Sequence, residues 1–280
     1  MGPDTTSAAL RAQIAGSSFY AGMRVLPRER REAMFAIYAF CRIVDDIADD
    51  QQGDRAARGA EMDGWRKDID ALYAGDEPGR AAFLVEPVRT YGLARDDFLA
   101  VIDGMTMDLV EDIKWPPMAM LDLYCDRVAS AVGRLSVRIF GMEHEPGIAL
   151  AFHLGRALQL TNILRDLDED AGIGRVYLPR EAILAAGIAL TTPHEVINDP
   201  RIDGAARTVA IEAHKHFDAA RAILRRGPKG HLLAPRLMEA AYTRVLSQTE
   251  AVGWAAPRTR ISVSKPALIW TALRLSLFGR

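Results

Sequence analysis

The chain has 280 residues, of which 49% are hydrophobic and 26% charged, and its net charge is −2 at pH 7. This length can bury a sizeable core, the composition is that of a soluble globular protein, and the near-neutral charge gives no reason to expect nucleic-acid binding. The two cysteines, Cys41 and Cys125, lie in apolar helical patterns, which indicates reduced core residues of a cytosolic protein and neither a disulfide framework nor a metal site.

The N-terminal third is predicted to be helical after a short polar and aromatic lead-in. Residues 1–18 contain no apolar core of signal-peptide length, so we expect a cytoplasmic protein. Pro27 favours a helix that begins near residue 28 and runs to about Asp50. A loop over 51–58 follows, and helical periodicity then predicts helices at about 59–74, 79–91 and 95–111.

The first long helix carries an acidic motif. Asp45 and Asp49 are four residues apart, and Tyr38 and Arg42 precede them at helical spacing, so all four share one face. Apolar residues flank this face, and a buried carboxylate needs a partner. One such pair is weak evidence for a site, because solvated aspartate pairs are common at helix ends.

The middle of the chain is predicted to be a long helix rich in small residues. Trp115-Pro116-Pro117 interrupts the helical pattern, and a helix is expected over 118–140. Near its middle it carries Ala129, Ser130, Ala131 and Gly133. These small residues indicate either close helix packing or room for a long apolar ligand. Tyr124, at the start of this segment, is interpreted either as a site residue or as an ordinary tyrosine of the core.

A second acidic motif lies on the central helix, which is predicted over 147–170. Gln159, Asn162, Asp166 and Asp170 are three, four and four residues apart, so they form one polar stripe in an otherwise apolar helix. Two same-face carboxylates one turn apart repel each other unless a cation lies near. Mg²⁺ prefers oxygen ligands and is commonly held by one or two carboxylates and substrate phosphates. Two such helices facing across a cavity could hold Mg²⁺ ions around a diphosphate.

Three arginines, Arg42, Arg165 and Arg175, lie on or beside the two acidic motifs. Arginine grips diphosphate well through paired hydrogen bonds. The alternative is that each arginine forms a structural ion pair with a neighbouring aspartate.

The C-terminal part continues the helical pattern. We expect a short helix at 179–186, a loop with a helix start at 191–200, helices at 202–226 and 231–252, and a last one at 265–278. The stretch 266–278 is too short to span a bilayer, and it is interpreted as a core helix or as a peripheral contact with a membrane surface. The chain is therefore predicted to be a single all-α domain over 1–280, and its oligomeric state is left open.

Other kinds of site find no support in the sequence. The histidines form neither an H-E-x-x-H motif nor a zinc spacing with cysteine, and neither a G-x-S-x-G elbow nor a P-loop is found. Of the motifs considered, the two helices that carry aspartate pairs form the candidate site whose chemistry is clear.

With these motifs in place, the chain resembles the squalene/phytoene synthase family from about Ser17 to Lys265. The resemblance rests on Tyr38-x-x-x-Arg42-x-x-Asp45-Asp46-x-x-Asp49, on Tyr124-Cys-x-x-Val128-Ala129-x-x-Val132-Gly133, and on Gln159-x-x-Asn162-x-x-Arg165-Asp166-x-x-x-Asp170 followed by Arg175-x-Tyr177-x-Pro179. It implies an all-α isoprenoid synthase fold with a central cavity, in which two prenyl diphosphates are joined with the help of Mg²⁺.

The resemblance also implies roles for individual residues. Metal binding falls to Asp45, Asp49, Asn162, Asp166 and Asp170, and Tyr124 is placed near a carbocation. One departure is Gly16, where some relatives carry serine. Substrate contact is implied for Ser18, Phe19, Tyr38, Arg42, Ala129, Val132, Gly133, Gln159, Asn162, Arg165, Arg175, Tyr177, Tyr242 and Arg260.

Within the family, the segments 16–20, 109–112 and 121–141 look most like bacterial presqualene diphosphate synthases of hopanoid biosynthesis. This implies that two farnesyl diphosphates are joined and that the reaction stops at the cyclopropyl product. The alternatives are phytoene or dehydrosqualene synthase, an NADPH-dependent squalene synthase, and a non-catalytic assembly factor. Retention of all four aspartates argues against the last of these.

Overall fold

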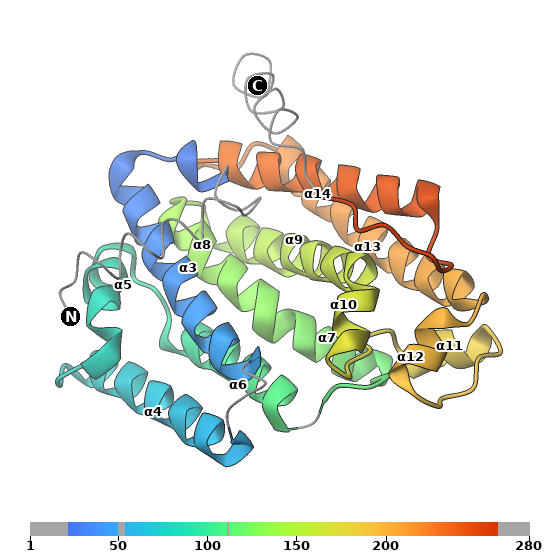
Figure 1. Cartoon of the computed structure of the whole chain (residues 1–280). Helices are drawn as coiled ribbons and strands as arrows, with labels where there is room; N and C mark the ends of the chain where they lie inside the picture. The colour runs from blue at the N-terminus through green and yellow to red at the C-terminus, as the bar shows by residue number, and fades with distance from the viewer. Residues whose placement is uncertain (1–21, 50–53, 111, 263–280) are drawn as a thin grey trace.

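Helices form every regular element in residues 22–49, 54–110 and 112–262, the part of the chain that the computed structural model describes (Figure 1). The all-α prediction is confirmed, and within the described residues extended backbone pairs only as an isolated bridge between Lys114 and Val176. The α-helices are α3 (Arg28–Asp49), α4 (Arg55–Ala74), α5 (Val85–Tyr91), α6 (Arg95–Val110), α7 (Met118–Cys125), α8 (Ala131–Ile139), α9 (His144–Arg165), α10 (Leu167–Gly172), α11 (Arg180–Ala185), α12 (Pro193–Asn198), α13 (Ile202–Arg225) and α14 (Leu233–Val252). Two further helical turns are η1, a 3₁₀ turn (Gly79–Leu84), and η2, a π turn (Asp126–Ser130).

Capping side chains explain several helix ends that the hydrophobic pattern misplaced. Helix α4 begins at Arg55 and not at 59, because the Asp54 side chain accepts the N–H of Ala56. Within 191–200, Thr192 and Glu195 form a reciprocal capping box that starts α12. The predicted helix over 265–278 and the lead-in before residue 22 lie outside the described residues.

The helix predicted over 118–140 is correct in position but is interrupted by the wide π turn η2. The buried Arg156 of α9 binds both ends of this turn, at Asp126 Oδ1 (3.2 Å) and Ser130 Oγ (3.0 Å). A Cβ at Gly155 would lie 2.7 Å from the Ser130 Cα, so only glycine lets α9 approach so closely. π turns of this kind are frequent at functional sites.

The single helix predicted over 147–170 is wrong, because the structure divides it at Asp166 into α9 and α10. The Asp166 backbone leaves the helical region at φ −105° and ψ 23°. In a continuous helix the carbonyl of Leu164 would accept the N–H of Asp168. Here it accepts the indole N–H of the buried Trp254 at 2.8 Å. The Asp170 N–H still reaches the Asp166 carbonyl at 2.9 Å, so the polar stripe continues across the break.

Helix α9 lies at the centre of the fold, with α3 and α8 on one side and α13 and α14 on the other (Figure 1). One hydrophobic cluster packs α9, α13 and α14 together, and a second packs α3, α4, α6 and α8. In the second cluster, the Phe40 ring meets Trp65 at 5.7 Å and Phe98 at 5.2 Å, in edge geometry. No helix within the described ranges is long and apolar enough to cross a membrane.

Candidate active site

Helix α3 brings its acidic motif to the seam between the two hydrophobic clusters. Arg42 Nη1 donates to Asp45 Oδ2 at 2.7 Å, and its Nη2 donates to Asp46 Oδ1 at 2.5 Å. Asp49, one turn beyond Asp45, accepts from Arg175 Nη1 at 2.7 Å. Arg42 and Arg175 therefore form the expected ion pairs with aspartates, and both line a shared cavity, so their binding of diphosphate stays a prediction.

The isolated bridge explains how Arg175 and Tyr177 reach the same cavity. Val176 donates its N–H to the Ile113 carbonyl at 2.8 Å, and its own carbonyl accepts the Trp115 N–H at 2.7 Å. In extended backbone, residues two apart point to the same side. Val176 is therefore buried on one side of this segment, while Arg175 and Tyr177 line the cavity on the other.

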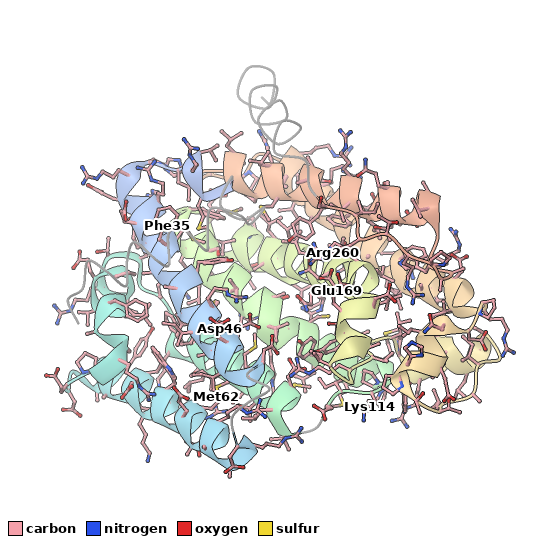
Figure 2. The ribbon with its side chains drawn as sticks, in the orientation of Figure 1. Phe35, Asp46, Met62, Lys114, Glu169 and Arg260 are labelled. Carbon is pink, nitrogen blue, oxygen red and sulfur yellow. The ribbon has the colours of Figure 1, made fainter. Side chains whose placement is uncertain are left out.

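The α9–α10 break places the second acidic motif opposite α3. Asp166 accepts from Arg165 Nε at 2.8 Å and from Arg260 Nε at 2.8 Å. Arg260 also lies 3.1 Å from Glu169, and Figure 2 shows these two side chains side by side above α10. Arg260, for which substrate contact is expected, thus contacts Asp166 but lines neither cavity.

Asp108 on α6 is a site residue that the sequence reasoning missed. It is 4% exposed, and its two oxygens accept hydrogen bonds from Tyr177 (2.6 Å) and Tyr124 (2.8 Å). The two tyrosine rings are stacked with centroids 5.0 Å apart. The sequence feature that could have indicated this residue is a single aspartate between the apolar Met105 and Leu109, which are buried. A carboxylate buried there without a partner would cost free energy, so it points to a specific role.

These residues line a polar cavity between α3, α6, α9 and α10, whose empty space of about 1050 Å³ includes solvent at its open side. Both acidic motifs line it, as do the three arginines that precede or follow them. Its lining also includes Cys41, Met105 and Ile173, which were not predicted as site residues. The predicted residues on its walls are Arg42, Asp45, Asp49, Tyr124, Gln159, Asn162, Arg165, Asp166, Asp170, Arg175 and Tyr177.

An apolar cavity of about 830 Å³ adjoins the polar one, and Val128, Gln159 and Asn162 line both. Its walls include Ala129, Val132 and Gly133, the small-residue face that the sequence singled out. That face also packs closely against α9, because a Cβ at Gly133 would lie 3.1 Å from the Ala151 Cα. A ligand with a charged head and a long apolar tail fits this pair of cavities in shape and polarity.

Burial and mutual repulsion disfavour the ionised form of several carboxylates in the site. Burial raises the pKa of Asp170 to about 8, with the Asp166 carboxylate adding to the shift and Arg175 opposing it. Burial likewise raises the pKa of Asp45 to about 6, with the Asp49 carboxylate second. Burial raises the pKa of Asp108 to about 6, against the pull of Arg175. A cation that entered the cavity would therefore relieve carboxylates that resist ionising together.

The donor set also fits a hard divalent ion. The buried Oδ1 of Asn162 has no hydrogen-bond partner, and the residue lines both cavities. Carboxylate and amide oxygens are the ligands that Mg²⁺ prefers. No three acidic, histidine or cysteine side chains among the described residues stand close enough to hold a metal alone.

A few predicted site residues do not line either cavity. Tyr38 lies on α3 and packs against the second hydrophobic cluster. Tyr242 is buried on α14 next to Arg165. Burial alone would lower the pKa of Arg165, but its hydrogen bonds to Asp166 and Tyr242 have the larger effect and raise that pKa. Ser18 and Phe19 lie outside the described residues.

Comparison with known proteins agrees with this geometry. The family model for squalene/phytoene synthase matches residues 13–267. The chain is 57% identical over 270 residues to a presqualene diphosphate synthase of Zymomonas mobilis, covering 95% of this chain and 92% of that protein. It is 52% identical over 270 residues to a presqualene diphosphate synthase of Rhodopseudomonas palustris, covering 96% of each. A crystal structure of a dehydrosqualene synthase with a bound ligand superimposes with a TM-score of 0.81 at 23% identity, over 98% of this chain and 96% of that one, which shows a shared fold.

Proposed function

Because this chain belongs to the squalene/phytoene synthase family, we propose that it joins two farnesyl diphosphates head to head and releases diphosphate and presqualene diphosphate. The observation that supports this most directly is that the two cavities lie next to each other and share Val128, Gln159 and Asn162 in their walls. One cavity is lined by arginines and carboxylates and the other by apolar side chains, as a prenyl diphosphate requires.

The diphosphate head belongs in the polar cavity. Arg42, Arg165 and Arg175 bring guanidinium groups to its wall, and each can bind phosphate oxygens through paired hydrogen bonds. Their present partners, the aspartates, are ligands for the ion that accompanies the diphosphate. Binding of head and ion together therefore redistributes existing ion pairs and adds little unpaired charge to a buried site.

We assign Mg²⁺ to this site, where Asp45, Asp49, Asn162, Asp166 and Asp170 would hold it with the phosphate oxygens. When bound, it would act as a Lewis acid that neutralises charge on the leaving diphosphate. The protein itself holds the two acidic helices on opposite walls of the polar cavity, and the central position of α9 makes this possible.

The prenyl chain belongs in the apolar cavity. Once the carbon–oxygen bond to diphosphate breaks, the allylic cation must be kept from water until the alkene of the second molecule attacks. Leu154, Leu158 and Phe140 line this cavity with apolar surface. Loss of a proton then closes the cyclopropane ring.

The runner-up functions differ in where the reaction stops or in the chain length accepted. Going on to squalene needs a second ionisation, a ring rearrangement and a hydride donor held beside the cation. Phytoene synthesis would need a longer tail than farnesyl.

The deciding experiment is incubation of the purified protein with farnesyl diphosphate and Mg²⁺, with and without NADPH, followed by mass spectrometry of the products. We expect presqualene diphosphate in both cases and no diphosphate release when EDTA replaces Mg²⁺. Squalene as the main product with NADPH, or a higher rate with geranylgeranyl diphosphate, would assign the chain to a runner-up function.

A further inference from the structure

Asp108 uses both of its carboxylate oxygens on the hydroxyls of two stacked tyrosines. Tyr177 donates its hydrogen to Oδ1 at 2.6 Å, and Tyr124 donates its hydrogen to Oδ2 at 2.8 Å. All three side chains are at least 94% buried, and they come from three separate parts of the chain. An ionised carboxylate accepts hydrogen bonds and cannot donate one, so it fixes the direction of both hydroxyls.

The direction of the two O–H bonds determines whether the tyrosines present a hydrogen or a lone pair to a ligand. A phenol has one hydrogen and two lone pairs. Asp108 is the nearest acceptor for each hydrogen, since the Tyr124 hydroxyl lies 3.4 Å from that of Tyr177. Each oxygen can therefore present only lone pairs to the polar cavity, which Tyr124 and Tyr177 line. Tyr124 also lies one helical turn before Val128, one of the residues shared by both cavities. The oriented oxygens therefore lie near the junction where a diphosphate head meets its apolar tail.

We propose that Asp108 is a positioning residue that orients the hydroxyls of Tyr124 and Tyr177 so that their oxygens face and stabilise the allylic cation. Preorganised dipoles aimed at developing charge are a major source of catalysis. Asp108 itself also lines the polar cavity, so its negative charge acts on a cation there together with the two oriented oxygens. This inference rests on the proposed function, since it concerns a cation that forms only there.

The test is the product distribution of Asp108→Asn with farnesyl diphosphate and Mg²⁺. The amide would donate a hydrogen to one tyrosine oxygen, so that hydroxyl would have to turn toward the cavity. We expect kcat to fall about a hundredfold, the effect of losing one positioned stabiliser, while KM stays within about threefold of the wild-type value. More of the cation should then be captured by water, which loses a proton and yields prenyl alcohol in place of presqualene diphosphate.

A matched control lies on the same helix. Asp97 is also buried, but it binds Arg134 at 2.5 Å and lines neither cavity. Asp97→Asn should lower the melting temperature without changing the ratio of alcohol to presqualene diphosphate. In a Tyr124→Phe/Tyr177→Phe background, Asp108→Asn should leave that ratio unchanged, because no hydroxyl remains to be turned.

The possible outcomes separate this inference from the proposed function. If the wild-type protein makes no presqualene diphosphate, the proposed function fails and the inference fails with it. If the wild type is active but Asp108→Asn keeps its product ratio, or shifts it equally in the double phenylalanine background, only the inference is overturned. Should Asp108→Asn not fold, Tyr177→Phe removes one of the two partners, and it must raise the alcohol fraction for the inference to stand.

Discussion

At the scale of single residues, the site depends on carboxylates that face each other from α3 and α10. Asp45→Asn and Asp170→Asn should each reduce turnover by about a hundredfold or more, on the scale of losing one positioned electrostatic stabiliser. Both side chains line the polar cavity, and each amide keeps the shape of the carboxylate it replaces. Release of diphosphate from farnesyl diphosphate at saturating Mg²⁺ measures the loss.

Asp63→Asn on α4 is the matched control, because this side chain is 72% exposed and lines neither cavity. It should retain full activity. Circular dichroism should show that all three variants are as helical as the wild type. Near-normal turnover of either Asp45→Asn or Asp170→Asn would contradict the model of two acidic motifs.

Residue spacing predicted which of these carboxylates share a helix face, but it gave no indication of Asp108. Helical steps of three and four place Asp45 and Asp49 on one face whatever the tertiary structure. Asp108 acquires its meaning only from partners 16 and 69 residues away in the chain. Such a triad depends on how α6, α7 and the bridge segment meet, which the spacing within any one helix does not encode.

At the scale of elements, the π turn and α8 form the wall of the apolar cavity. Ala129→Phe should fill space that the prenyl tail occupies, because Ala129 lines that cavity. We expect at least about a tenfold loss of kcat/KM with farnesyl diphosphate, a conservative figure for overpacking a fitted pocket, and a smaller loss with geranyl diphosphate. Steady-state kinetics with both substrates provides the measurement.

Ala119→Phe is the control for this substitution, since Ala119 is exposed on α7, just ahead of the same π turn. It should leave both substrates unaffected. Unchanged kinetics for Ala129→Phe with farnesyl diphosphate would place the small-residue face in ordinary helix packing.

A histidine pair joins α9 to α13 and should make stability depend on pH. His153 Nδ1 and His216 Nδ1 are 3.1 Å apart, a contact that requires at least one neutral ring. Burial lowers the pKa of both; His216 is further affected by His153, Arg156, Asp122 and Glu212. A histidine with a lowered folded pKa contributes stability above its unfolded pKa, near 6.5, and loses it as the pH falls.

The measurement is the melting temperature between pH 7.5 and about 5.5, the range that brackets the ordinary histidine pKa. Buried acids such as Asp170 change stability in the opposite direction, so the comparison is between wild type and His216→Gln. The variant should lose less stability than the wild type as the pH falls. His194→Gln on α12, at an exposed position, should follow the wild type, and a parallel curve for His216→Gln would exclude a role for the pair.

The break between α9 and α10 shows why hydrophobic periodicity fails at this scale. The pattern from Leu158 to Leu167 continues without interruption, so periodicity predicts one helix. The cause of the break, Trp254, lies 90 residues after the carbonyl of Leu164 that it captures. Helix positions elsewhere agree within a few residues, because local caps and apolar faces decide them.

At the scale of the whole molecule, the site lies where two hydrophobic clusters meet. The Arg175–Asp49 ion pair, whose partners are 126 residues apart in sequence, connects α3 of the second cluster to the segment that carries Val176 of the first. We therefore expect the chain to behave as one domain and to unfold in a single thermal transition. Calorimetry in which the van't Hoff and calorimetric enthalpies agree would support this; two separable transitions would contradict it.

Ligand binding at the seam should stabilise the whole chain. Mg²⁺ with inorganic diphosphate at about 100 times the dissociation constant adds about 2.7 kcal/mol of unfolding free energy, which for a chain of this size means several degrees in melting temperature. Asp170→Asn should abolish most of this gain, whereas Asp63→Asn should keep it. An equal gain in both variants would place the ions elsewhere on the protein.

The contact between Trp254 and Leu164 also gives the protein an optical reporter. The indole is fully buried, and its N–H is bonded to the last turn of α9, two residues before Asp166. Arg258, four residues further on, binds Asp168 of α10 at 3.0 Å. We expect a change at the junction of the two helices to alter the surroundings of this indole. In a variant that keeps only this one of the four tryptophans, the ultraviolet emission should then follow the filling of the cavity in real time without an attached dye.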